Sequence, residues 1–310
     1  MNRRTLIAGG AGTLLAASRA PAFAQAAPIR VAITDNDSGI CPYYAQQQGI
    51  FARAGLNVEI QQMSSSGGAA QALVAGAVDV AVCDALQVAN AMIHGFPMIA
   101  LAGGCTFSKD SPTLVLVTQK NSAIRVARDL EGQTVGVVAL KSLSASSVNE
   151  WLRLGGADPS KVKFFELPFP DMSAGIARGS LSAALLGEPF LTAGHADQRA
   201  LAVPFEALGG AFYVNVLATS RSWVTKNSVA AKRFTSAMFE AARWANAHRA
   251  ESAAFEATLT KIPLDTVSMM ARNVFATTWD PKLLEPVLAV GARYRLTDRL
   301  VRSAEITLAI

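Results

Sequence analysis

Two carboxylates stand at matching places in a pattern that occurs twice in the chain. Each copy turns on a glycine, runs through apolar residues typical of a buried strand and ends near an acid: residues 76–84 end at Asp84 and residues 179–188 at Glu188. Ligands bind outside the carboxyl ends of strands in open α/β sheets, so we expect both acids beside a cleft between two similar lobes. Two acids there predict a ligand with hydrogen-bond donors or a positive group besides any acid. The alternative is that one of them is tied to backbone N–H groups as a structural cap.

Serine-rich turns precede two expected helices and are suited to binding an anion or another hydrogen-bond acceptor. The free N–H groups of a helix N-terminus carry roughly half a positive elementary charge. The predicted ligand contacts are Ser64, Ser65, Ser66 and Gly67 in the first turn, and Lys141, Ser142 and Ser144 in the second. The alternative is that the serines are ordinary helix caps and that Lys141 is solvated.

Aromatic residues at expected strand ends could line the binding site of an organic ligand. Tyr43 and Phe169 are the foremost of these, because both sit just past a strand in a turn marked by proline. Such a lining favours an organic acid, a sulfonate or a heterocycle over a bare inorganic ion. The alternative is that these rings belong to the hydrophobic core.

The elements that must position these residues form two α/β lobes. Expected strands of the first lobe cover residues 29–34, 57–62, 78–83 and 98–102; those of the second cover 113–118, 134–138, 162–167 and 183–186, and 211–219 is a return strand. Expected helices cover residues 42–54 and 144–154 and begin at Met172, after Pro189 and after Ser228. We predict lobe 1 from residues 25–113 and 216–310, with the C-terminal helices, and lobe 2 from residues 114–215. Residues 113–118 and 211–219 are the expected crossings between the lobes.

The first 24 residues are predicted to be an export signal. Arg3 and Arg4 precede an apolar stretch, and Ala22-Phe23-Ala24 is a small-x-small cleavage site, in a pattern similar to a twin-arginine leader. Removal of its three arginines lowers the formal charge from +5 to +2, and no basic cluster with interleaved aromatics remains. A nucleic-acid partner is therefore not expected. The mature chain also lacks an apolar run of roughly 18 residues, so we expect it to be soluble. The alternative is that the first residues form an amphipathic helix of the folded domain.

The sequence carries no recognisable metal or enzyme motif. Cys41, Cys83 and Cys105 fall near the ends of expected strands, where one disulfide plus a free thiol or three buried thiols are both possible. There is no Cys-x-x-Cys, no Gly-x-Ser-x-Gly, no phosphate-binding glycine loop and no His-Glu-x-x-His. We therefore expect a protein without catalytic residues, metal or cofactor.

Several short motifs together resemble periplasmic solute-binding proteins of ABC importers, in the subgroup for sulfonates, nitrate, taurine and thiamine precursors. The motifs are Pro42-Tyr43-Tyr44-Ala45, Gly49-Ile50-Phe51, Gly55-Leu56-Asn57-Val58-Glu59, Ala72 to Asp79, Asp129 to Val137, Ser142 to Ser144 and Gly187-Glu188-Pro189. They cover most of residues 29–220. Ser182, where the family usually has Asp, and Gly155-Gly156-Ala157, where it usually has Gly-Leu, depart from the pattern.

The resemblance implies a monomeric periplasmic protein of two lobes that close on a small-molecule ligand by a hinge motion. It also implies partnership with a permease and ATPase complex in the inner membrane. Two alternatives share the fold. One is a cytosolic enzyme similar to menaquinone-pathway proteins or to thiamine-pyrimidine synthases, which carry a cysteine-rich motif that is not seen here. The other is a periplasmic sensor subunit, and the export signal argues against the enzyme.

Overall fold

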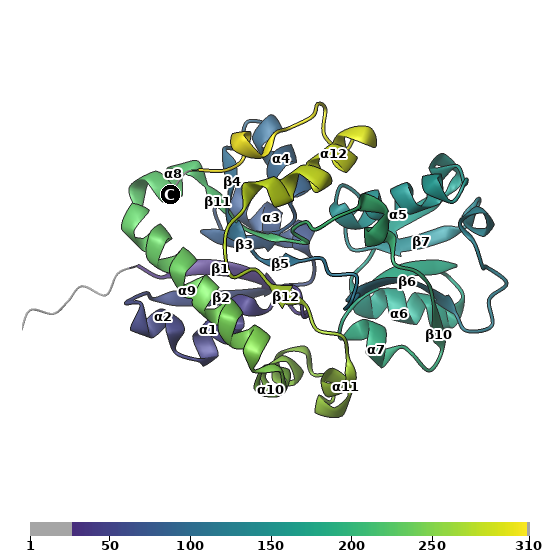
Figure 1. Cartoon of the computed structure of the whole chain (residues 1–310), viewed down its shortest axis with the longest axis horizontal. Coiled ribbons are helices and arrows are strands. Elements are labelled where there is room, and N and C mark those ends of the chain that lie inside the picture. Colours follow the sequence, from purple (N-terminus) through teal and green to yellow (C-terminus); the bar gives the residue numbers. More distant parts are fainter. Residues whose placement is uncertain (1–26, 309–310) are drawn as a thin grey trace, which may run out of the picture.

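The computed structural model describes residues 27–308, so the predicted export signal lies outside the described residues. Figure 1 shows two lobes, each built on its own sheet with helices packed around it. Within residues 27–308, two five-stranded sheets and one two-stranded sheet are present. The prediction of a two-lobe α/β fold is confirmed.

The first sheet has the order β2-β1-β3-β11-β4. Its strands are β1 (Ile29–Thr34), β2 (Val58–Met63), β3 (Val80–Cys83), β4 (Met98–Gly103) and β11 (Val216–Ser220). β1 runs parallel to β2 and β3, whereas β11 is antiparallel to both β3 and β4. We call the part of the molecule around this sheet lobe 1.

The second sheet repeats this arrangement with the order β8-β7-β9-β6-β10. Its strands are β6 (Leu114–Gln119), β7 (Thr134–Val137), β8 (Lys163–Glu166), β9 (Ala183–Gly187) and β10 (Gln198–Ala202). β7 is parallel to β8 and β9, and β6 is antiparallel to β9 and β10. β3 and β9, the two copies of the sequence repeat, therefore hold equivalent places in lobe 1 and lobe 2.

Helices follow most strands, and local residues set where they start and stop. The lobe helices are α1 (Cys41–Gln47), α2 (Ile50–Arg53), α3 (Ser66–Val74), α4 (Ala85–Ile93), α5 (Leu143–Leu154), α6 (Phe169–Arg178) and α7 (Phe190–Ala193). The single helix predicted over residues 42–54 is wrong, because Gly49 adopts a φ of 66° and separates α1 from α2. α6 begins at Phe169, directly after Pro168, rather than at Met172.

The C-terminal part of the chain adds α8 (Arg221–Lys226), α9 (Ser228–Ala247), α10 (Arg249–Thr260), α11 (Leu264–Met269) and α12 (Glu285–Arg293). α9 packs on α1 and α2, where Phe234 stacks on Phe51 with ring centroids 5.5 Å apart. α12 lies against α4 of lobe 1 and α5 of lobe 2, above the gap between the lobes in Figure 1. Between residues 27 and 308, no helix combines the length and apolar character needed to cross a membrane.

The chain passes between the lobes in the segments that precede β6 and β11. β5 (Cys105–Thr106) pairs with β12 (Val274–Phe275) beside these passages. β6 and residues 216–220 lie inside the sheets, so only the first residues of the expected crossings 113–118 and 211–219 lie between the lobes. The exact lobe boundaries stay a prediction.

Candidate functional site

A cavity of about 60 Å³ lies between the lobes, where the loops that follow the strands of both sheets meet. Lobe 1 contributes residues after β1, β2 and β3, and lobe 2 contributes residues around the starts of α5 and α6. The lining residues are Thr34, Asn36, Ser38, Ser64, Ser65, Ser66, Val82, Asp84, Leu114, Val138, Leu143, Ser144, Phe169, Phe205, Val214 and Asn215. Six of the predicted ligand contacts are among them.

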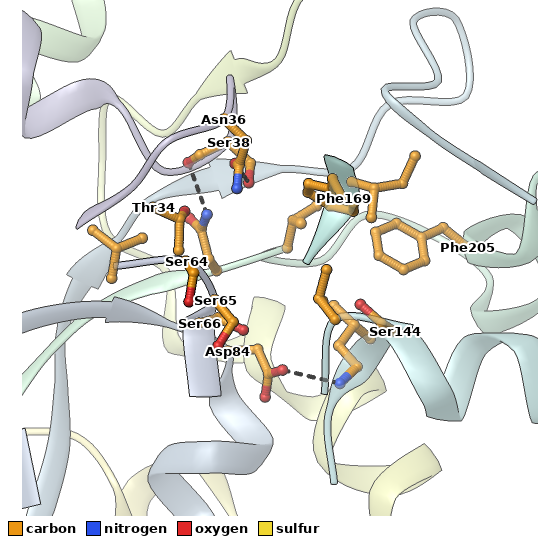
Figure 2. Close-up of a pocket in the computed structure, with 16 residues that line it drawn as sticks. Thr34, Asn36, Ser38, Ser64, Ser65, Ser66, Asp84, Ser144, Phe169 and Phe205 are labelled. Carbon is orange, nitrogen blue, oxygen red and sulfur yellow. Dashed lines mark hydrogen bonds between the residues drawn. The ribbon is translucent and has the colours of Figure 1, made fainter. Parts of the chain in front are cut away.

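The serine turn before α3 forms one wall of the cavity (Figure 2). Ser65 is the N-cap of α3, and its Oγ accepts a hydrogen bond from Gly68 N at 3.1 Å. The Oγ of Ser66 accepts from Gln87 Nε2 at 3.3 Å. Because each oxygen is already an acceptor, its own O–H group is available to donate. Gly67 lies beyond the cavity, where a Cβ built on it would be 3.7 Å from the Cβ of Ala139 in lobe 2.

The turn before α5 supplies only one of its three predicted contacts. Ser144 lines the cavity from the first turn of α5. Ser142 is fully buried as the N-cap of that helix, accepting from Ala145 N and donating to the carbonyl of Ala139. Lys141 is exposed and lies in a groove outside the cavity. Ser142 is thus a helix cap and Lys141 a surface residue, as the alternative reading allowed.

Asp84 lies in the cavity wall but is held by backbone groups. Its Oδ1 accepts from Leu86 N at 2.9 Å and Gln87 N at 3.1 Å, which caps α4. Its Oδ2 accepts from Leu143 N of lobe 2 at 3.0 Å, the bond drawn in Figure 2. Burial raises the pKa of Asp84 to about 6, although the three N–H donors act in the opposite direction. The side chain is therefore both part of the site and the structural cap considered above.

Glu188 holds the equivalent place after β9 but does not line the cavity. Its carboxylate accepts from Thr192 N at 3.0 Å and Thr192 Oγ1 at 2.9 Å, within the first turn of α7. Burial raises its pKa to about 7. In this structure Glu188 caps a helix rather than reaching the cavity. The repeated pattern predicted the place of this acid along the chain but not the direction of its side chain.

Phe169 and Phe205 contribute aromatic surface to the cavity, on the side opposite Ser64, Ser65 and Ser66 in Figure 2. Phe169 rests on Gly187, where a Cβ would lie 2.8 Å from the ring, so glycine is needed there. Phe205 comes from the short 3-10 helix Pro204–Leu208 and was not predicted. Tyr43 instead packs, half-buried, against the core of lobe 1. One of the two foremost predicted aromatics therefore lies at the site.

Two asparagines add polar groups that sequence reasoning missed. Asn36 Oδ1 accepts from Gly39 N at 3.1 Å and Ser38 Oγ at 2.7 Å, so the Nδ2 group is left to donate. Both polar atoms of the Asn215 amide are hydrogen-bonded to the protein. Its Oδ1 accepts from Cys105 N, and its Nδ2 donates to the carbonyl of Ser38. The polar loop after the first expected strand was the only sequence signal for Asn36, whereas nothing local marked Asn215.

The cavity carries little charge, and its lining is rich in hydrogen-bond donors. No lysine or arginine of the described chain lines it, and Asp84 is its one acid. α3 and α5 point their N-termini at it from opposite lobes. Ser65, Ser66 and Asn36 each have a donor left after their hydrogen bonds to the protein. The arrangement suits a group that accepts several hydrogen bonds.

The cysteines do not belong to this site. Cys41, Cys83 and Cys105 are buried free thiols, and burial raises the pKa of each well above its usual value. Of the two arrangements left open by the sequence, the structure shows three buried thiols. Among residues 27–308 no group of histidine, cysteine and acidic side chains is arranged to hold a metal ion.

Solved structures share this fold. The alkanesulfonate-binding protein SsuA from Xanthomonas axonopodis pv. citri, bound to MOPS, superposes with a TM-score of 0.78 at 16% identity, covering 92% of this chain and 99% of that one. The periplasmic nitrate-binding protein NrtA from Synechocystis PCC 6803 gives 0.73 at 16% identity, covering 90% and 86%. The desulfurization enzyme DSZB gives 0.66 at 14% identity, covering 90% and 96%.

Sequence comparison identifies the family. No curated protein matches the chain. A family model described as NMT1/THI5 like matches residues 37–252, which is more than half of the chain. That range contains every residue that lines the cavity except Thr34 and Asn36. The chain therefore belongs to the NMT1/THI5-like family, on the two-lobe fold of periplasmic binding proteins.

Proposed function

We propose that this protein is the extracytoplasmic solute-binding component of an ABC import system, which captures a small organic anion or zwitterion between its lobes. The observation that carries the proposal is the cavity itself. It is enclosed by both lobes, contains donors aimed from two helix N-termini and has no cationic side chain among its described lining residues. A partner with several acceptor oxygens, such as a sulfonate or a carboxylate, matches that polarity.

The ligand has an organic part as well as its acceptor group. Phe169 and Phe205 cover one side of the cavity with aromatic surface. A bare inorganic ion would leave those rings without a partner, whereas an alkyl or ring substituent packs against them. A carboxylate offers about four lone-pair sites, and Asp84 uses three of them. One site is thus left for a donor group of a zwitterion.

The fold and the predicted leader support the proposed setting. Residues 1–24 direct export, the mature protein works as a soluble monomer in the periplasm, and loaded protein delivers its ligand to a permease and ATPase complex. SsuA and NrtA are binding proteins by name, which supports this role. N-terminal sequencing of periplasmic material should begin near Gln25, and full-length chain in the cytosol would contradict the localisation.

An enzyme is the second candidate, because the desulfurization enzyme DSZB has the same fold. The described cavity gives little support to it. Its lining contains hydroxyl, amide and apolar groups and one carboxylate that is committed to three backbone donors. Histidine and cysteine do not occur in that lining. The hydrogen bonds recorded for Asp84, the one carboxylate of that lining, come from backbone N–H groups and not from a serine hydroxyl, so it is not paired with a nucleophile there.

A thermal-shift screen followed by calorimetry tests the proposal. The panel contains ethanesulfonate, butanesulfonate, taurine, MOPS, nitrate, benzoate and an aminopyrimidine. A ligand at about 100 times its dissociation constant stabilises the folded state by roughly 2.7 kcal/mol. We expect sulfonates to stabilise the protein and to be recovered unchanged. Ser144→Ala should weaken binding, whereas Ser160→Ala, on the exposed surface, serves as the control. Turnover of a bound compound would favour the enzyme.

A further inference from the structure

Gln87 connects the cap of α4 to the serine wall of the cavity without lining the cavity itself. Its Oε1 accepts a hydrogen bond from Asp84 N at 3.0 Å, which completes the capping box of α4. Its Nε2 donates to Ser66 Oγ at 3.3 Å. One amide group therefore contacts the backbone of Asp84 and the side chain of Ser66, two residues that line the cavity.

The orientation of this amide is fixed by chemistry. A backbone N–H group can only donate, so the atom that faces Asp84 N must be the amide oxygen. The amide nitrogen then faces Ser66, and Ser66 Oγ must act as the acceptor in that contact. The hydroxyl proton of Ser66 consequently points away from Gln87. Within residues 27–308, the contact with Gln87 is the one hydrogen bond recorded for the Ser66 hydroxyl, and in it the oxygen accepts.

We propose that Gln87 is a positioning residue that holds the Ser66 hydroxyl as a donor toward the cavity. It thereby selects ligands whose head group accepts hydrogen bonds without donating them, such as a fully ionised sulfonate. This inference rests on the proposed function, because it concerns the ligand of the same cavity. It extends the site to a residue outside the cavity that acts only through Ser66.

The test uses a substitution that replaces the donor facing Ser66 by an acceptor and keeps the acceptor that completes the capping box of α4. In Gln87→Glu, the carboxylate still accepts from Asp84 N, since glutamate is the usual partner in a capping box. Its second oxygen, however, can only accept, so the Ser66 proton turns toward it and the cavity loses a donor. We expect thermal stability close to that of the wild type and a dissociation constant for butanesulfonate that rises about tenfold or more, as for one lost charge-assisted bond.

A double-mutant cycle separates this effect from the added negative charge. Calorimetry with butanesulfonate compares the wild type, Q87E, Ser66→Ala and the double variant. We expect Q87E to weaken binding by less than about threefold in the Ser66→Ala background, because the positioned hydroxyl is absent there. Gln71→Glu is the matched charge control, because Gln71 and Gln87 both line the groove outside the cavity that contains Lys141, and no hydrogen bond is recorded between Gln71 and Ser66 within the described residues.

The outcomes distinguish the two proposals. An equal loss from Q87E in both backgrounds, or an equal loss from Gln71→Glu, would show that charge alone matters and would overturn the positioning role while leaving the proposed function in place. A wild-type protein that binds none of the panel would overturn the proposed ligand class and this inference with it. Loss of the Q87E effect in the Ser66→Ala background supports the role of Gln87.

Discussion

The Oδ2 atom of Asp84 lies 3.0 Å from the backbone nitrogen of Leu143, so a carboxylate of lobe 1 caps the first turn of a helix in lobe 2. The same side chain caps α4 through its other oxygen. The first N–H groups of a helix have no partner within the helix and need an acceptor from elsewhere. For Leu143, at the start of α5, that acceptor is the carboxylate of Asp84. The Asp84 carboxylate therefore stabilises the contact between the lobes. The N–H group of Leu143, at the edge of the cavity, is already hydrogen-bonded to it.

Replacing Asp84 by Asn should weaken this contact between the lobes. An amide that keeps its oxygen toward Leu86 and Gln87 presents an NH₂ group to Leu143 N, which places two donors face to face. We expect the free energy of unfolding to fall by about 1 to 3 kcal/mol. In solution scattering the ligand-free variant should have a larger radius of gyration than the wild type. Asp171→Asn, at the exposed start of α6, is the control; equal values for both variants would show that the Asp84 contact does not hold the lobes.

Stability should depend on pH through Glu188. Burial raises its pKa from 4.5 to about 7, so the folded protein binds this proton more tightly than the unfolded chain does. Its stabilising contribution is fully present below about pH 4.5 and is lost as the pH rises through about 7. The loss is on the order of 3 kcal/mol.

Urea unfolding between pH 4 and 8 measures this dependence. Glu188→Gln has no proton to lose and should show a flatter profile than the wild type. The amide keeps an acceptor for Thr192 N, so the cap of α7 is preserved. Parallel profiles for the two proteins would mean that Glu188 does not titrate in this range.

Gly67 should set how closely the lobes approach. A Cβ at this position lies 3.7 Å from the Cβ of Ala139, which is ordinary contact. Gly67→Ala should therefore bind butanesulfonate as the wild type does and gain up to about 1 kcal/mol of stability from its higher helix propensity. Gly67→Leu should act as a wedge and weaken binding by about tenfold or more, since overpacking costs about 1 to 3 kcal/mol. Calorimetry on both variants checks this, and equal affinities would exclude contact at this point.

A second polar contact joins Glu150 of α5, in lobe 2, to Tyr294, which follows α12. Tyr294 donates to Glu150 Oε2 at 2.6 Å, and Arg153 and Arg293 also pair with this buried carboxylate. Tyr294→Phe should lower the free energy of unfolding by about 1 to 2 kcal/mol. Tyr43→Phe is the matched control, because Tyr43 is also partly buried against the core and no hydrogen bond of its hydroxyl is recorded within residues 27–308. Equal denaturation midpoints for the two variants would contradict the prediction.

Strand positions were predictable because most of these strands are short apolar runs bounded by glycine or polar turns. The strand 29–34 has the predicted bounds, and the expected 183–186 lies within β9. β10 was not predicted, since its sequence begins with Gln198 and Arg199 and has the polar character of an edge. The helix boundaries were harder, because they depend on single residues such as Gly49 and Pro168.

The site was partly predictable for a different reason. Ser65, Ser66 and Ser144 sit at helix starts, which local sequence reveals, and Phe169 follows a strand in a proline-marked turn. Asn215 and Phe205 reach the cavity only because the chain returns between the lobes, a long-range event that leaves no local pattern. Asp84 and Glu188 occupy equivalent places, yet only Asp84 meets a helix start from the opposite lobe.

The two sheets differ in how they are assembled along the chain. Every strand of the second sheet comes from residues 114–202, whereas β11, which lies between β3 and β4, comes from residues 216–220. During synthesis, lobe 2 can therefore fold from one continuous segment. The sheet of lobe 1 is complete only after β11 has been made, and β11 follows every strand of the second sheet in the sequence. Until residue 220 is available, β3 has one open edge and β4 has no neighbouring strand in the sheet, so both leave backbone groups unpaired. These two strands are where an incomplete chain would pair wrongly with another copy of itself.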